Sequence, residues 1–91
     1  MVKLVDASAR NKKYPKTFQV PSKKEVKALC LHSLVKLGVI TTPPSGVERM
    51  WFRIVEIKGD QFKGRLQNTP LNGDMRYGDE IYFNGRHIMS I

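Results

Sequence analysis

The sequence feature that most constrains the fold is a series of short alternating segments separated by glycine-containing turns. Residues 48–57 are rich in β-branched and aromatic side chains, and Gly59-Asp60 after them is a turn dipeptide. In the next segment, residues 61–67, apolar and polar positions alternate: Phe62, Gly64 and Leu66 against Gln61, Lys63, Arg65 and Gln67. Because successive side chains of a strand point to opposite faces, this pattern predicts a hairpin with one buried face and one face in water.

The register of this hairpin predicts an irregularity. With strict pairing across the turn, Ile57 faces Phe62, and Arg53 then shares the core face with Leu66. Yet Phe52 and Ile54, not Arg53, have the character of core residues. Since a slip of one residue reverses the faces of a strand, we expect a β-bulge within residues 53–56, of the kind that curls a small sheet into a barrel.

Further short elements surround this hairpin. Ser22 and Glu25 have the spacing of a capping box, which predicts a helix over residues 23–29. Strands are expected at residues 34–40, 80–83 and 87–91, with Asn84-Gly85 as a tight hairpin turn between the last two. The sequence therefore predicts a mainly β fold, a small curled antiparallel sheet or an SH3-like or OB-like barrel, with one short N-terminal helix.

The positive charge of the chain is concentrated at its N-terminal end. The 91 residues carry a formal net charge of +8. Residues 1–27 hold eight basic and two acidic side chains, a net charge of +6, and residues 28–91 hold eight and six, a net charge of +2. Residues 1–15 also show no hydrophobic period. We therefore expect residues 1–15 to be a basic flexible arm and residues 16–91 to form a single β-rich domain.

The acidic side chains do not form a catalytic pattern. Asp60, Asp74 and Asp79 each follow a glycine, so turn chemistry explains them. We find no nucleophile with a base and no paired carboxylates, and we expect a protein that is not an enzyme and uses no cofactor.

A metal site is not expected either. Cys30, His32 and His87 are too few and too scattered for a zinc site. Cys30 lies among leucines and is expected to be a buried, inert thiol. The single cysteine and the lack of a long apolar run indicate a cytoplasmic protein that contacts no membrane.

Several short motifs between residues 17 and 91 follow one another in a recognisable order. They are Thr17-Phe18, Pro21-Ser22, Leu34-Val35-Lys36-Leu37, Glu48-Arg49-Met50-Trp51, Gly59-Asp60 with Phe62 and Gly64, Leu66 with Asn68 and Pro70, Tyr77-Gly78-Asp79-Glu80 and His87-Ile88. Together they resemble the YegJ-like bacterial domains of unknown function. One departure is that His32-Ser33 stands where such domains tend to have Gly-Asp before the first long strand. The resemblance implies a compact β-rich fold and no known activity.

The candidate contact residues are basic. They lie in the N-terminal segment and on the water-facing side of the predicted strands: Arg10, Lys12, Lys13, Lys16, Lys23, Lys24, Lys27, Arg53, Lys63 and Arg65. Trp51 either packs into the fold or stacks on a partner, and we favour packing because its size suits a small core.

Two functions fit these residues. The first is a binding module that contacts nucleic acid through the basic arm and helix. The alternative is a protein-interaction module that modulates or inhibits a bacterial or phage enzyme, through the arm on an acidic surface or through an edge strand. We expect no small-molecule substrate, and the oligomeric state stays open.

Overall fold

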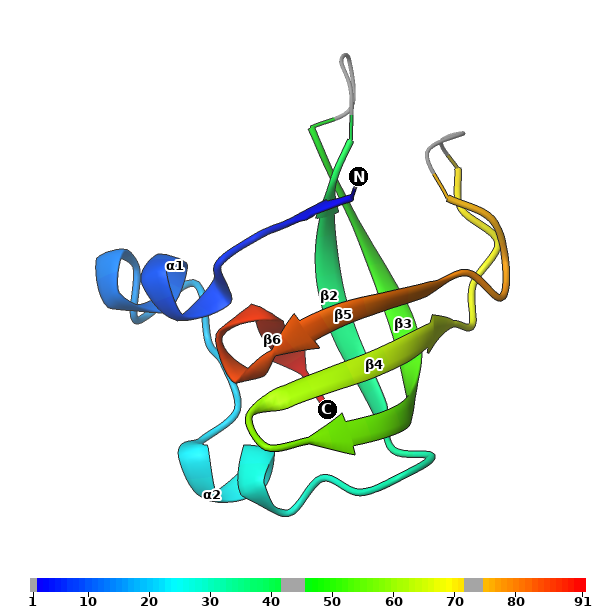
Figure 1. Ribbon diagram of the computed structural model, residues 1–91. Coiled ribbons are helices and arrows are strands. Elements are labelled where there is room, and N and C mark those ends of the chain that lie inside the picture. The colour runs from blue at the N-terminus through cyan, green and yellow to red at the C-terminus, as the bar shows by residue number, and fades with distance from the viewer. Residues whose placement is uncertain (1, 42–45, 72–74) are drawn as a thin grey trace.

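The longest strand, β3, organises the sheet. The computed structural model describes residues 2–41, 46–71 and 75–91. In it, β3 (Val47–Lys58) pairs antiparallel with β2 (Leu34–Ile40) on one side and with β4 (Gln61–Leu66) on the other. β5 (Glu80–Asn84) follows on β4, so that the chain forms an antiparallel, nearly closed barrel-like sheet (Figure 1). The prediction of a mainly β, barrel-like fold with a short N-terminal helix is confirmed.

The predicted β-bulge is present in β3. Ile54 pairs with Gly64, and Glu56 pairs with the next residue of β4, Lys63, so Val55 is the extra residue. This offset lets Phe52 and Ile54 face the core before the bulge and Ile57 face Phe62 after it. The sequence argument from side-chain faces therefore located the bulge correctly.

The core fills the inside of the curled sheet. Its most deeply buried side chains are Phe52, Leu37, Ile54, Leu66, Ile88, Val35 and Val39. The rings of Phe62 and Phe83 stack with their centroids 5.3 Å apart and their planes 17° apart. Gly64 lies next to the Phe83 ring, and a Cβ there would stand 2.8 Å from Phe83 Cε1 and 3.0 Å from Phe52 Cβ. Only glycine fits at this close approach of two aromatic residues.

The N-terminal segment is built into the sheet, which corrects the expectation of a loosely attached arm. β1 (Lys3–Leu4) pairs with the end of β2, and the Val5 amide donates to the Gly38 carbonyl at 2.9 Å. Val5 is buried, and so is the first residue of α1 (Ala7–Lys13). The stretch is too short to show a hydrophobic period, but the uncovered edge of β2 offers it backbone partners.

The C-terminal segment also differs from its prediction. Asn84-Gly85 does not form a hairpin, because the Asn84 side chain accepts a hydrogen bond from the Arg86 amide at 3.2 Å and caps a short 3₁₀ helix, η1 (Gly85–His87). β6 (Ile88–Ser90) then pairs with β2 rather than with β5. β1 and β6 thus share the edge of β2 that β3 leaves free.

The capping box of the predicted helix is confirmed. Ser22 and Glu25 exchange hydrogen bonds of 3.1 and 2.9 Å, and α2 (Lys23–Lys27) follows, two residues shorter than expected. The chain then turns, and Cys30 is exposed, with its sulfur 3.5 Å from Ser33 Oγ. The expectation of a buried thiol was wrong, because the helix ends before the leucine-rich stretch can turn Cys30 inward. Neither α1 nor α2 has the length and apolar character of a membrane-crossing helix.

Replacing Gly64 with alanine will destabilise the protein by about 1–3 kcal/mol, the usual cost of overpacking a core. The physical reason is the contact that the new Cβ makes with Phe83 and Phe52. Urea unfolding followed by tryptophan fluorescence measures the change. Gln61→Ala, at an exposed position of the same strand, serves as the control and should stay within about 0.5 kcal/mol of the parent protein. Equal stability of the two variants would show that the sheet opens easily at this point.

Candidate functional site

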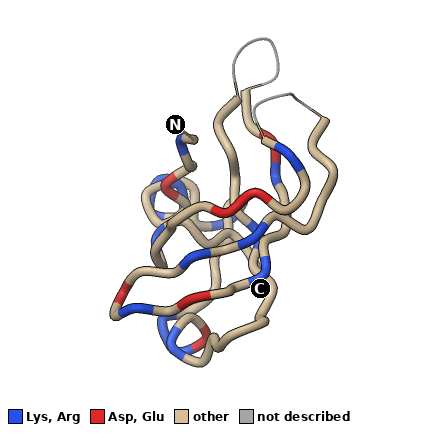
Figure 2. The backbone as a smooth tube through the Cα atoms, turned by 45° about the vertical axis from the view of Figure 1, so that its right-hand side comes forward, with Lys and Arg blue, Asp and Glu red and all other residues tan. Residues whose placement is uncertain are grey.

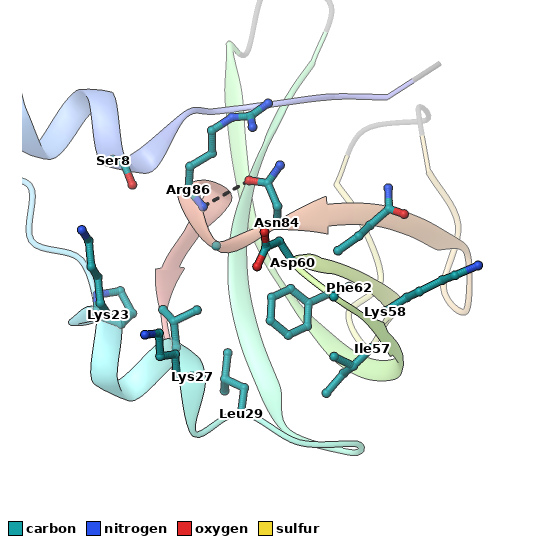
Figure 3. Close-up of a pocket in the computed structure, with 15 residues that line it drawn as sticks. Ser8, Lys23, Lys27, Leu29, Ile57, Lys58, Asp60, Phe62, Asn84 and Arg86 are labelled. Atoms are coloured by element: carbon teal, nitrogen blue, oxygen red, sulfur yellow. Dashed lines mark hydrogen bonds between the residues drawn. The ribbon is translucent and has the colours of Figure 1, made fainter.

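An open cleft of about 840 Å³ lies between α2, the β3–β4 turn and η1 (Figure 3). α1 reaches its edge through Ser8. The other lining residues are Pro21, Lys23, Val26, Lys27, Leu29, Ile57, Lys58, Gly59, Asp60, Gln61, Phe62, Asn84, Gly85 and Arg86. We call this hollow the α2 cleft. It joins segments that are far apart in sequence, so it exists only in the folded chain.

The first wall of the α2 cleft is the helix itself. Val26 and Leu29 are partly buried and pack against the core, which fixes α2 on the barrel. Lys23 and Lys27 are four residues apart, so they lie on the same face of the helix. Both side chains are exposed and line the cleft. The wall is therefore apolar at its base and cationic above it.

The opposite wall carries a carboxylate. Gly59, with a φ of +59°, makes the tight turn between β3 and β4, and Asp60 follows it. Figure 3 shows the Asp60 carboxylate directed toward the cleft, above the ring of Phe62. Asn84 lies next to it on this wall. The α2 cleft thus has lysines on one side, a carboxylate and an amide on the other, and an apolar floor between them.

Two further cations line the cleft but direct their charges away from it. The Lys58 ammonium extends outward from the β3–β4 turn in Figure 3. Arg86 Nε lies 3.6 Å from Asp6 Oδ2, and the same view shows its guanidinium pointing away from the cleft. Of the labelled charged groups, Figure 3 shows the Asp60 carboxylate directed into the cleft, whereas Lys23 and Lys27 line the opposite wall with exposed side chains.

The cations of the predicted strand face have partners. Arg65 donates from Nε and Nη2 to Glu80 Oε2 at 3.0 and 2.8 Å, and Lys63 Nζ lies 3.6 Å from the other oxygen, Oε1. Hydrogen bonding from Arg65 lowers the pKa of Glu80, and the neighbouring Tyr82, followed by Glu80, raises the pKa of Lys63. The charges of Lys63 and Arg65 are thus partly neutralised, and neither residue lines the α2 cleft.

Arg53 and Trp51 lie on the same water-facing side of the sheet. Arg53 Nη2 donates to Gln67 Oε1 at 3.1 Å. Trp51 is half-buried, and Lys36 Nζ covers its ring at 5.0 Å from the centroid. The backbone of Trp51 bonds to Asn68 Oδ1 and to the Gln67 amide, so it ties β3 to the segment that leaves β4. These contacts indicate that Trp51 packs within the protein and does not serve as an exposed platform for stacking.

The predicted N-terminal cations have no such partners. In the part of the chain that the structure describes, every cation that forms an ion pair lies between residues 63 and 86. The exposed, unpaired cations of α1, α2 and the segment between them are Arg10, Lys12, Lys13, Lys16, Lys23, Lys24 and Lys27. Figure 1 shows α1 and α2 on the same side of the barrel, and Figure 2 shows basic residues along both. We call these seven residues the basic side.

The structure adds residues that the sequence argument missed. Asp60 and Asn84 had been explained as turn residues, Ile57 and Phe62 as residues that face each other across the hairpin, and Leu29 had been given no role in binding. Their common position around the α2 cleft depends on the packing of α2 against the β3–β4 hairpin, for which the sequence carries no local signal. Within residues 2–41, 46–71 and 75–91, no group of three or more His, Cys, Asp or Glu side chains is placed to hold a metal ion.

Comparison with family models, curated proteins and solved structures gives no match for this chain. The resemblance to the YegJ-like domains therefore stays a prediction. The function has to be argued from the arrangement of the residues themselves.

Stability will fall as the pH drops from about 7 to about 5, and His87 will account for much of the change. Burial, and then the charge of Arg86, lower the pKa of His87, whose Nδ1 accepts a hydrogen bond from the Asn84 amide at 3.1 Å. The unfolded chain therefore takes up the proton first, and stability is lost as the pH falls below the ordinary value of 6.5. Urea unfolding across this range measures the effect, and His87→Gln should show a flatter profile. Parallel profiles for the two proteins would contradict it.

Proposed function

We propose that the protein is a non-enzymatic binding module that contacts nucleic acid through the basic side. The observation that carries the proposal is the distribution of ion pairs. Glu80 engages Lys63 and Arg65, and Asp6 engages Arg86, whereas the seven cations of the basic side have no carboxylate partner among the described residues. Unpaired, exposed cations gathered on one side of a small protein attract a polyanion.

The contact expected from these residues is with phosphates. Lysine is a mobile point charge, and six of the seven residues are lysines. Such residues neutralise phosphates and release counterions without reading the sequence of the bases. Binding should therefore tolerate many sequences and weaken steeply with salt.

The structure changes which residues we assign to this contact. The sequence predicted that Lys63, Arg65 and Arg53 belong to the interface. We no longer assign them to it, because Glu80 and Gln67 on the water-facing strands already engage their side chains. The α2 cleft replaces them, because Lys23 and Lys27 belong both to it and to the basic side. The proposed interface runs from α1 along residues 14–22 to α2 and the cleft.

A protein partner is the second candidate function, and the edge of β5 favours it. Among the described strands, β5 pairs only with β4. An unpaired strand edge can accept an extended segment of another protein by backbone hydrogen bonding. A partner that is captured from lysate, survives nuclease treatment and is lost when β5 is blocked would support this function over nucleic-acid binding.

Replacing Lys23 and Lys27 with glutamine will weaken binding to single-stranded oligonucleotides of about 12 nucleotides by about tenfold. The slope of log Kd against log salt concentration should decrease by the amount that corresponds to about two phosphate contacts, because two neutralising charges are lost. Fluorescence anisotropy between about 50 and 200 mM salt measures both quantities.

The matched control is Lys63→Gln with Arg65→Gln, which removes the same two charges from the strand face. We expect it to change the affinity by less than about threefold, because Glu80 already engages both residues. Equal losses in the two double variants would mean that only net charge matters and would remove the assigned interface. No binding by the parent protein at the lower salt concentration would overturn the proposed function.

A further inference from the structure

The α2 cleft contains a carboxylate and apolar side chains that phosphate binding does not require. A polyanion on its own requires cations, which Lys23 and Lys27 supply. It gains nothing from an apolar floor, and a carboxylate facing the same space repels it. The Asp60 carboxylate and the floor of Leu29, Ile57 and Phe62 must therefore suit another part of the ligand.

The floor suits a flat, apolar group. Ile57 is 40% exposed although it faces the interior of the curled sheet, so it offers apolar surface to the cleft. Leu29 is half-buried, and Phe62 is held in place by its stacking on Phe83. Phe62 itself is buried, so Ile57 and Leu29 supply the accessible apolar surface, and apolar side chains can contact the face of a nucleobase that has left its stack.

The Asp60 carboxylate suits a hydrogen-bond donor. It lies across the cleft from the lysines and accepts no hydrogen bond from any described residue. An ionised carboxylate is an acceptor only, and it pairs with the exocyclic amino group of cytosine, adenine or guanine. A base with a carbonyl oxygen in that position would instead set two acceptors against each other.

We propose that the α2 cleft holds one unstacked nucleotide of a single strand, with its phosphate at Lys23 and Lys27 and the amino group of its base at Asp60. This inference rests on the proposed nucleic-acid function and adds to it a preference for bases that carry an amino group. A duplex is disfavoured because its bases are stacked and its amino groups are already paired. The basic side then holds the neighbouring phosphates without regard to sequence.

The test compares oligo-dC with oligo-dU of about 12 nucleotides, since cytosine carries an amino group where uracil carries a carbonyl oxygen. We expect the parent protein to bind oligo-dC about fivefold more tightly, the size expected for one hydrogen bond to a charged group in a partly open site. A strand of the same length without bases should bind more weakly than either. Asp60→Asn should lose the preference, because an amide can face either base.

The control variant is Glu56→Gln, which removes the same charge at an exposed position outside the cleft. Both variants gain nonspecific affinity from the lost negative charge, but only Glu56→Gln should keep the preference for oligo-dC. Thermal melting confirms that both variants fold.

The outcomes separate the two proposals. Equal binding of oligo-dC, oligo-dU and the base-free strand would overturn the nucleotide site and leave the phosphate contact standing. A preference that persists in Asp60→Asn would place the recognition elsewhere and also overturn the inference. If the parent protein bound none of the three strands at about 50 mM salt, the proposed function itself would be refuted.

Discussion

The one-residue offset in β3 is the constraint on which the rest of the structure depends. The first half of this strand pairs with β2 and the second half with β4, and Val55 takes up the extra position between them. Without it, Ile57 and Phe62 would turn to the water-facing side together, because a slip of one residue reverses both faces. The β3–β4 hairpin could then neither bury Phe62 against Phe83 nor form a wall opposite α2. The curl of the barrel and the α2 cleft thus have the same origin.

The charges of the molecule are divided between two kinds of surface. On the strands, Glu80 of β5 lies opposite Arg65 of β4 and also engages Lys63, so one carboxylate holds two cations of the water-facing side. On α1 and α2 the cations have no such partners. A net charge of +8 is therefore not spread evenly, and Lys23 and Lys27, which have no carboxylate partner among the described residues, line the α2 cleft. This coincidence of free charge and concave shape makes the α2 cleft the best candidate site.

The sequence predicted what depends on neighbouring residues. The alternation in residues 61–66, the turn at Gly59 and the capping box at Ser22 are local patterns, and the conflict of faces around Arg53 was enough to locate the bulge. Pairing between distant segments was not predictable in this way. Asn84-Gly85 has the sequence of a hairpin turn. In the structure, however, β6 pairs with β2 and not with β5, and the Asn84 side chain caps η1. Likewise, Lys63 and Arg65 were correctly placed in water, whereas their pairing with Glu80 depends on the register of β5.

The sharing of one edge of β2 by β1 and β6 has a consequence for the order of folding. β2 lies in the first half of the chain, yet its free edge is covered in part by residues 3–4 and in part by residues 88–90. During synthesis, β1 can dock early, but half of the edge stays open until β6 has been made. Contacts between such distant segments slow folding, and open strand edges expose a chain to association with other copies. The barrel is therefore completed by β6, and until that strand pairs with β2 the sheet has an unprotected edge.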